Sequence, residues 1–428
     1  MANSIVVREY ARLTSEKLES NTLDQAQISE TAFTWLCELD QTYRSSGSRL
    51  LEKNGQQWIR LDSYVGVLES PCGQVIEILP KHHDEGDVEE FSRLLLRKLI
   101  ASALDLPSRE AEEAALSLYH TSLSEWVMHQ FLLSLEHLLM KGIRFDYQRL
   151  EEEQRYLRGQ LDFVKQMRQP PSRQHFFQIR HDVFLADRPE NRLLRSALEV
   201  VCRTAQHSDN WRLARELLSQ LQELPESRDT KSDFGLWRND RLMAHYQSIK
   251  PWCELILYQY MPLAIAGDYR GISLLFPMER LFEQHVAKVL AHKLQHSATL
   301  RTQAASRYLC QHLGSPIFQL RPDLLIESGE KSWVLDTKWK RLDESDRQNK
   351  YGLSQGDLYQ MLAYAREYLP EGKGEMVLIY PKNKYFQQPL APFDFSHNLR
   401  LQIWPFDLDK DELLCSAETT LPLHCLSV

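Results

Sequence analysis

The sequence predicts a mixed α/β (α+β) chain that ends in a domain built on a mixed sheet flanked by helices. Three observations support this prediction. Short strands with turn signals lie within 57–81, helical periodicity dominates 88–261, and two apolar strands joined by a turn lie within 320–338. At 428 residues the chain is too long for one ordinary core. We therefore expect several structural segments.

Composition shifts divide the chain into three predicted segments. Residues 1–85 form a β-rich N-terminal module, residues 86–265 a helical and basic middle region, and residues 266–428 the sheet domain. Within the first segment, residues 1–50 are polar and show helical periodicity only around Thr31 to Tyr43. Its expected strands are Trp58–Leu61, Tyr64–Leu68 and Val75–Leu79.

The middle region reads mainly as packed amphipathic helices. Ser122 and Glu125 form a plausible capping box, and Gly142 is a plausible stop for the helix between them. Apolar residues at helical spacing predict helices over 88–104, 122–141, 188–203, 211–224 and part of 235–261.

A locally basic segment interrupts these helices at 141–180. It holds nine Lys and Arg residues against five acids, and six aromatic residues lie among them. Basic and aromatic side chains together can follow phosphates and stack on bases, which would make the segment a DNA contact. The alternative is the solvated side of a sheet.

In the sheet domain, the two strands around 320–338 place acidic residues at matched positions. If Gly329-Glu330 is a two-residue turn, Ser328 pairs with Lys331. Asp323 then lies opposite Asp336, with side chains roughly 5 Å apart on one face. Lys338, two residues further on, shares that face. Leu324, Ile326, Trp333 and Leu335 form the opposite, apolar face.

Two carboxylates held together are costly unless a cation lies between them. Magnesium prefers carboxylate ligands, binds a scissile phosphate and lowers the pKa of an attacking water. A neighbouring lysine can orient that water and stabilise developing charge. We therefore predict a Mg²⁺ site held by Asp323, Asp336 and Glu283, with Lys338 as the catalytic lysine. Glu279, one turn from Glu283, is the alternative helix ligand.

Helices on either side of the two strands add polar residues to this prediction. The helix 277–295 carries Glu279 and Glu283, and the helix 354–369 carries a polar stripe separate from its apolar one. The polar stripe of the helix 354–369 consists of Asp357, Gln360 and Tyr364, and it completes the candidate site. Apolar runs at 376–380 and 399–404 predict further buried strands.

Several other classes of protein are disfavoured. The chain has no phosphate-binding loop of the G-x-x-x-x-G-K-[ST] type, no G-x-S-x-G and no H-E-x-x-H. No apolar run approaches membrane-spanning length, and no signal peptide is evident. Seven scattered cysteines without a C-x-x-C pair indicate a reducing cytoplasm and no structural zinc. We expect His82-His83 to be an exposed loop pair. Because the net charge is −8, any DNA binding would depend on local basic patches rather than on the overall charge.

Pro322-Asp323 with Asp336-Thr337-Lys338 resembles the signature of PD-(D/E)xK nucleases, and Gln360 with Tyr364 resembles the QxxxY element of their RecB-like branch. Met278–Glu283, Leu335–Trp339 and Asp357–Tyr364 resemble, more narrowly, the McrC subunit of McrBC modification-dependent restriction systems. Shorter upstream stretches resemble the same family: Tyr64–Val67, Ile76–Lys81, Leu157–Gly159 and Arg188–Arg192.

The resemblance implies a PD-(D/E)xK endonuclease domain that cleaves DNA with Mg²⁺. It also implies a partner, a McrB-like AAA+ GTPase that recognises modified DNA and translocates, while the N-terminal module docks in the partner's ring and stimulates GTP hydrolysis. Self-association is left open. Two alternatives remain: a non-cleaving assembly and GTPase-activating subunit, and a stand-alone RecB-like DNA-processing nuclease.

Overall fold

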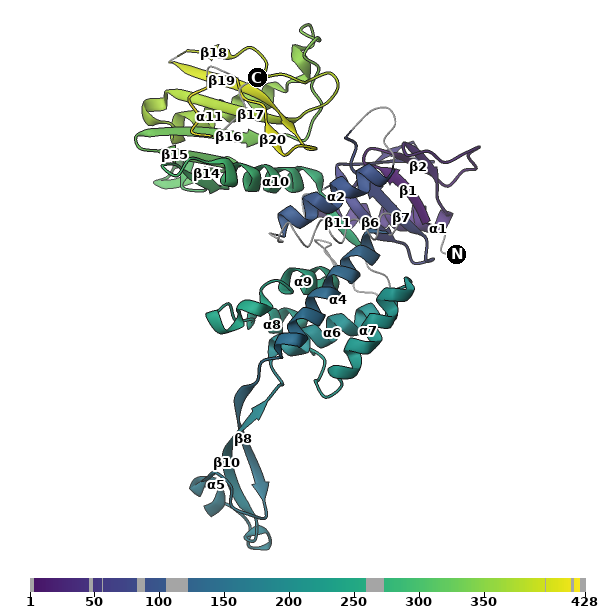
Figure 1. The fold of residues 1–428 in the computed structure, drawn as a ribbon, viewed down its shortest axis with the longest axis vertical. Helices are drawn as coiled ribbons and strands as arrows, with labels where there is room; N and C mark the ends of the chain where they lie inside the picture. Colours follow the sequence, from purple (N-terminus) through teal and green to yellow (C-terminus); the bar gives the residue numbers. More distant parts are fainter. Residues whose placement is uncertain are drawn as a thin grey trace. The chain divides into compact units, whose positions relative to one another are not determined.

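The described residues form two compact units. The first comprises Met1–Leu123 and Leu275–Val428, and the second comprises Ser124–Leu274. The prediction of a mixed α/β chain is confirmed, since both units contain helices and strands (Figure 1). The computed structural model describes residues 4–45, 49–55, 57–82, 89–104, 122–258, 273–396, 398–416 and 419–423.

The N-terminal part of the first unit contains two small sheets and helix α1. One sheet has the order β1-β7-β6-β11 and the other β3-β2-β5-β4. β1 pairs in parallel with β7 and buries Val7 completely, although the polar character of residues 1–50 gave no prediction of a strand there. The bounds are β1 Ser4–Arg8, β2 Arg12–Thr14, β3 Gln25–Gln27, α1 Glu30–Ser45, β4 Leu51–Asn54, β5 Trp58–Leu61, β6 Tyr64–Glu69, β7 Val75–Leu79 and β11 Leu274–Pro277.

Two elements join this N-terminal part to the C-terminal sheet domain. β11 (Leu274–Pro277) is the edge strand beside β6, and it runs directly into helix α10 (Met278–Lys293). Helix α2 (Glu89–Ala103) packs against both β7 and α10. The predicted boundary at 85/86 therefore lies just before a helix that belongs to the first unit.

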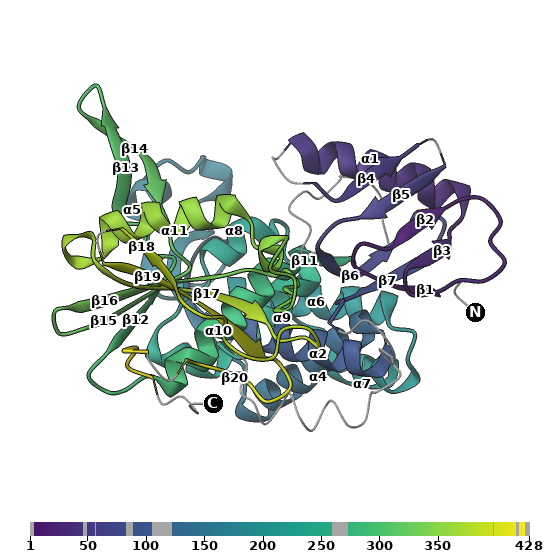
Figure 2. The ribbon, with the colours of Figure 1, turned by 90° about the horizontal axis from the view of Figure 1, so that it is seen from above.

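The sheet of the C-terminal domain has the order β12-β15-β16-β17-β19-β18, with β20 paired to β19. The sheet is mixed. β16, β17 and β19 run parallel to one another, whereas the pairs β12–β15, β15–β16 and β18–β19 are antiparallel. α10 and α11 lie on opposite sides of these strands (Figure 2). The bounds are β12 Thr299–Thr302, β15 Leu324–Ser328, β16 Lys331–Thr337, α11 Gln355–Tyr368, β17 Gly374–Pro381, β18 Phe393–Phe395, β19 Leu399–Asp407 and β20 Glu412–Leu413.

The pairing of β15 with β16 confirms the predicted register. Ser328 is paired with Lys331, and the ladder continues to Leu324 paired with Leu335. One step further, Asp323 lies at the position facing Asp336, just before β15 begins. The predicted apolar face is buried, with Leu324, Ile326, Trp333 and Leu335 at most 3% exposed. The other face is buried too, because Leu325 and Val334 pack under α11.

The second unit is a group of helices from which a long hairpin extends (Figure 1). Trp126 and Trp252 meet edge to face in its core, with ring centroids 5.3 Å apart. Gly159 is required in the hairpin, since a Cβ there would lie 2.4 Å from the Arg180 carbonyl oxygen. The bounds are α4 Leu123–Lys141, β8 Asp146–Gln154, β9 Gln160–Leu161, α5 Phe163–Met167, η1 Pro171–Arg173, β10 Phe177–Leu185, α6 Pro189–Thr204, α7 Ser208–Gln220, α8 Thr230–Gly235, η2 Arg241–Tyr246 and α9 Lys250–Tyr258.

Two general expectations can be compared with the structure. Among the helices of the described residues, none is both long and apolar enough to cross a bilayer. Cys37, Cys72, Cys202, Cys253 and Cys310 are free thiols.

Candidate active site

The centre of the candidate site is an ion pair at the end of β16. Asp336 is 1% exposed, and its Oδ2 is paired with the ammonium group of Lys338. Both residues point to the same face because strand side chains alternate with period two. Lys338 also donates to Oε1 of Gln360 on α11 at 3.1 Å. The acid and the lysine predicted from the strand pattern are thus brought into direct contact.

The electrostatics of this pair are those of a crowded, buried group of charges. Burial raises the pKa of Asp336, and the neighbouring Asp323 raises it further, against the effect of Lys338. Burial alone would lower the pKa of Lys338, but the Asp336 carboxylate raises it. The lysine is therefore held as a cation beside an acid whose negative charge is costly to bury.

Asp323 is fixed by contacts that the sequence pattern did not predict. Its Oδ2 accepts from the backbone N–H of Thr337 at 2.8 Å and from the Thr337 hydroxyl at 2.7 Å. Its Oδ1 lies 3.4 Å from Nε2 of Gln303, which also donates to Glu283 at 2.5 Å. Gln303 comes from the turn after β12 and had no sequence signal. It links two of the three predicted metal ligands, Glu283 and Asp323.

The structure distinguishes the two alternative glutamates on α10. Burial and the charge of Asp323 raise the pKa of Glu283, so this carboxylate lies close to the site. Glu279 is exposed. Glu283 is therefore the α10 carboxylate that the structure brings to Asp323.

Helix α11 contributes the predicted polar stripe. Nε2 of Gln360 donates to the Tyr364 hydroxyl at 2.7 Å, and this hydroxyl donates to the Arg321 carbonyl at 2.9 Å. A continuous series of contacts thus runs from Asp336 through Lys338, Gln360 and Tyr364 to the backbone before Asp323. Asp357 stands apart from this series and pairs with Lys340 at 3.0 Å.

Replacing Tyr364 with phenylalanine tests the importance of this series. The variant leaves the Arg321 carbonyl and the Gln360 amide without their partner, so we expect a stability loss of about 1–3 kcal/mol. The nuclease prediction from the sequence implies that the variant should also lower DNA cleavage, because Gln360 would no longer hold Lys338 as firmly. Urea unfolding and a cleavage assay measure both effects. Tyr359→Phe is the control on the same helix, since the Tyr359 hydroxyl is exposed and, within the described segments, accepts from the exposed Gln355. If Tyr364→Phe and Tyr359→Phe had the same stability and the same cleavage rate, the contacts of Tyr364 would have no role in positioning Lys338.

The acidic residues fit magnesium in their chemistry. Within the described part of the chain, no three His, Cys, Asp or Glu side chains already converge as ligands of one metal ion. Gln303 lies between Glu283 and Asp323, and Lys338 occupies an oxygen of Asp336. Burial and then the charge of Asp323 nevertheless raise the pKa values of Glu283 and Asp336, and a bound cation would relieve the repulsion from Asp323. Carboxylate oxygens are also the donors that Mg²⁺ prefers.

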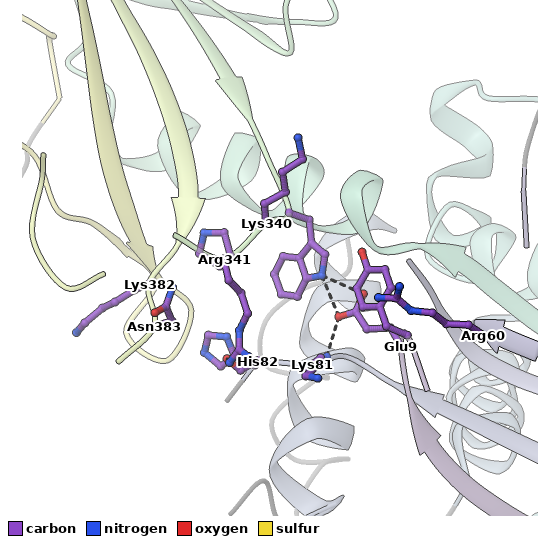
Figure 3. Close-up of a pocket in the computed structure, with 11 residues that line it drawn as sticks. Glu9, Arg60, Lys81, His82, Lys340, Arg341, Lys382 and Asn383 are labelled. Atoms are coloured by element: carbon purple, nitrogen blue, oxygen red, sulfur yellow. Dashed lines mark hydrogen bonds between the residues drawn. The ribbon is translucent and has the colours of Figure 1, made fainter. Parts of the chain in front are cut away.

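A cavity of about 290 Å³ borders the residues that follow Lys338 (Figure 3). At one end Glu9, from the chain after β1, accepts from Nε1 of Trp339 at 2.9 Å and from the Lys81 amide at 2.7 Å. Burial raises the pKa of Glu9 to about 7. The basic side chains of the lining are Arg60, Lys81, Lys340, Arg341 and Lys382.

The expectation that His82-His83 is an exposed loop pair is wrong for His82. This residue is 7% exposed and lines the cavity, and its carbonyl accepts from Arg341 at 3.2 Å. His82 is buried because it lies against Arg341 and the other residues that line the cavity. His83 lies outside the described residues.

The basic segment at 141–180 forms most of the long hairpin of the second unit. Several of its cations are paired with its own acids: Lys165 and Arg180 contact Glu151, and Arg180 also contacts Asp162. Four of its six aromatic residues are exposed, namely Phe145, Tyr147, Tyr156 and Phe163. The ion pairs neutralise some of its cations locally, but the segment keeps an excess of four positive charges.

Comparison with known proteins assigns the chain to a family. The family described as "McrBC 5-methylcytosine restriction system component" matches residues 59–381. That match spans 381 − 59 + 1 = 323 of 428 residues, about three quarters of the chain. The chain therefore belongs to this family of restriction-system components.

Individual relatives agree with this assignment. The chain is 23% identical over 277 residues to the type IV methyl-directed restriction enzyme EcoKMcrBC of Escherichia coli K12, covering 60% of this chain and 75% of that protein. A refined half-complex of Thermococcus gammatolerans McrB AAA+ hexamers with bound McrC matches 94% of both chains, with a TM-score of 0.69 and 18% identity. A cryo-EM structure of the McrBC complex from the same organism matches 72% of this chain and 90% of its own, with a TM-score of 0.52 and 18% identity. At this identity the structural matches establish the fold.

Proposed function

We propose that this chain is the Mg²⁺-dependent endonuclease subunit of a McrBC-like restriction complex. The main supporting observation is the buried Asp336–Lys338 pair at the end of β16, beside Asp323 and Glu283. The order of elements also fits a PD-(D/E)xK nuclease of the RecB-like branch, because an acidic helix, an acid-bearing hairpin and a Gln–Tyr helix follow one another. We take the chain to be the McrC-like member of the complex.

The residues of the site have distinct roles in this proposal. Asp323, Asp336 and Glu283 hold the metal ion, which when bound supplies a Lewis acid for the scissile phosphate and a more acidic water. Lys338 orients the attacking water and stabilises the negative charge that develops on the phosphate. Gln360 and Tyr364 position Lys338. Thr337 holds the Asp323 carboxylate through two hydrogen bonds.

The partner in this proposal is a McrB-like AAA+ GTPase that recognises modified DNA. The structures that this chain resembles are complexes of McrB AAA+ hexamers, which supports a partner of that kind. Two surfaces are candidates for the contact. The predicted one is the N-terminal module, residues 1–85. The other is helix α5 of the hairpin of the second unit, where Phe163 is 72%, Val164 61% and Met167 84% exposed. Grouped apolar residues in solvent are typical of protein contacts.

A reconstitution experiment tests the proposed function and separates it from its alternatives. The purified chain, alone or with its GTPase partner, is incubated with methylated DNA in the presence of Mg²⁺ or EDTA. We expect Mg²⁺-dependent cleavage that requires the partner and GTP. Cleavage by the chain alone would favour a stand-alone RecB-like nuclease. Stimulated GTP hydrolysis without any cleavage would favour an assembly and GTPase-activating subunit.

A further inference from the structure

A two-stranded ribbon projects from the C-terminal domain next to α11 (Figure 2). Its strands are β13 (Arg307–His312) and β14 (Ser315–Leu320), joined at Leu313-Gly314. Among the described residues, these strands pair only with each other, and every residue of β13 is exposed. An isolated two-stranded ribbon is only marginally stable in water. A partner that covers it would therefore stabilise it.

The base of the ribbon is fixed at the candidate active site. The Tyr368 hydroxyl on α11 lies 2.9 Å from the Leu320 carbonyl and accepts from the Arg307 amide at 3.3 Å. β14 then leads through Arg321 and Pro322 directly to Asp323. Whatever the ribbon binds is therefore held beside the acidic residues of the site.

The ribbon lies in a segment that lacks negative charge. Residues 284–322 contain no Asp or Glu and five Lys or Arg, whereas the whole chain has 59 acids in 428 residues. The next acidic residue in the sequence is Asp323, which belongs to the candidate site. The ribbon itself, residues 307–320, carries Arg307 and no carboxylate, so it adds no like-charge repulsion to the binding of a polyanion.

Large apolar side chains lie on the same ribbon. Leu313 at its tip is 91% exposed and Phe318 is 68% exposed, and both have positive φ angles, of 50° and 57°. Tyr308 and Leu309 on β13 are exposed as well. Exposed apolar residues on a projecting element mark a contact surface. Apolar side chains of DNA-binding proteins contact thymine methyl groups or wedge between base steps.

We propose that the β13–β14 ribbon enters a groove of duplex DNA and holds the strand that is to be cut against the active site. This inference rests on the proposed nuclease function and names the element that grips its substrate. B-DNA's major groove, about 12 Å wide, admits a two-stranded ribbon. Leu313 and Phe318 make the apolar contacts within the groove, and Arg307 contacts a phosphate near the base of the ribbon.

The test measures DNA binding by the full chain in an Asp336→Asn background, so that the DNA stays intact. Gln311→Glu with His312→Glu places two carboxylates on the exposed ribbon. We expect the Kd for duplex DNA to rise about tenfold at low salt, and this effect to shrink as salt is added. The matched control is Gln295→Glu with His296→Glu. These residues are also an exposed Gln-His pair, but they precede β12 and lie outside the ribbon. The control should change Kd less than twofold.

A photo-crosslinker placed at position 313 identifies what the ribbon touches. Crosslinking to the DNA in the full complex supports the proposal. Crosslinking only to a second copy of the chain or to the GTPase overturns the proposal. In the binding test, an equal change in Kd for both double variants overturns it as well. So does the absence of DNA binding by the full chain. If the wild-type complex cleaves DNA while the ribbon variant binds DNA normally, the nuclease assignment stands and the role of the ribbon fails alone.

Discussion

Replacing Asp336 with asparagine should reduce Mg²⁺-dependent DNA cleavage by the reconstituted complex by at least about 10³-fold. Asparagine keeps the shape of the side chain but removes the charge that binds a cation and holds Lys338. Lys338→Ala should cause a comparable loss, because the ammonium group that faces Asp336 is then absent. Single-turnover cleavage of a methylated duplex measures both effects.

The matched control for this prediction is Asp394→Asn. Asp394 lies on β18 of the same sheet, but it is exposed and pairs with Arg400. We expect its loss to change cleavage less than twofold, since an exposed ion pair contributes little. All three variants should keep the wild-type circular dichroism spectrum and should bind the partner. Substantial cleavage by Asp336→Asn would remove these residues from the active site, whatever the chain's role in the complex.

Replacing Glu9 with glutamine should change how the stability of the first unit depends on pH. Glu9 is fully buried, and its pKa in the folded state is raised by burial to about 7, from 4.5. The folded state therefore binds more protons than the unfolded state between these pH values, and stability falls as pH rises through that window. Above pH 7 the loss is complete. It amounts to roughly 3 kcal/mol at most, because one pKa unit corresponds to about 1.4 kcal/mol.

Glutamine removes this titration and keeps an acceptor for the Lys81 amide and Nε1 of Trp339. The variant should equal the wild type near pH 4.5 and exceed it in stability above pH 7. The measurement is the difference in urea midpoint between the two proteins at several pH values. Glu19→Gln, at an exposed position, should follow the wild-type curve. Parallel curves for the wild type and Glu9→Gln would contradict the prediction, because they would show that the pKa of Glu9 is the same in the folded and unfolded states.

The β15–β16 hairpin could be predicted from the sequence because its pairing is determined by residues that are close together in the chain. A glycine turn fixes the register, and the period of two then decides which residues share the face of Asp336. The stripe of α11 was predictable for the same reason, since helical spacing places Gln360 and Tyr364 together. Both predictions depend only on residues close in the chain.

The remaining features depend on pairings between distant residues. Gln303 reaches Asp323 from a turn, and Glu9 reaches Trp339 across 330 positions of sequence. No spacing rule encodes such contacts. The pairing of β1 with β7 was missed because the apolar run Ile5–Val7 is short and lies in an otherwise polar stretch, although Val7 is fully buried. The ribbon at 307–320 was missed because both its strands are exposed and lack an apolar alternation.

The position of β11 has a consequence for synthesis of the chain on the ribosome. β11 pairs with β6, yet about 200 residues separate Glu69 from Leu274. At typical elongation rates of about 5–20 residues per second, roughly 10–40 s pass between synthesis of these strands. During that time the edge of β6 is uncovered, while the whole second unit is translated and can fold. The nascent N-terminal sheet is therefore an aggregation-prone intermediate that a chaperone would be expected to protect.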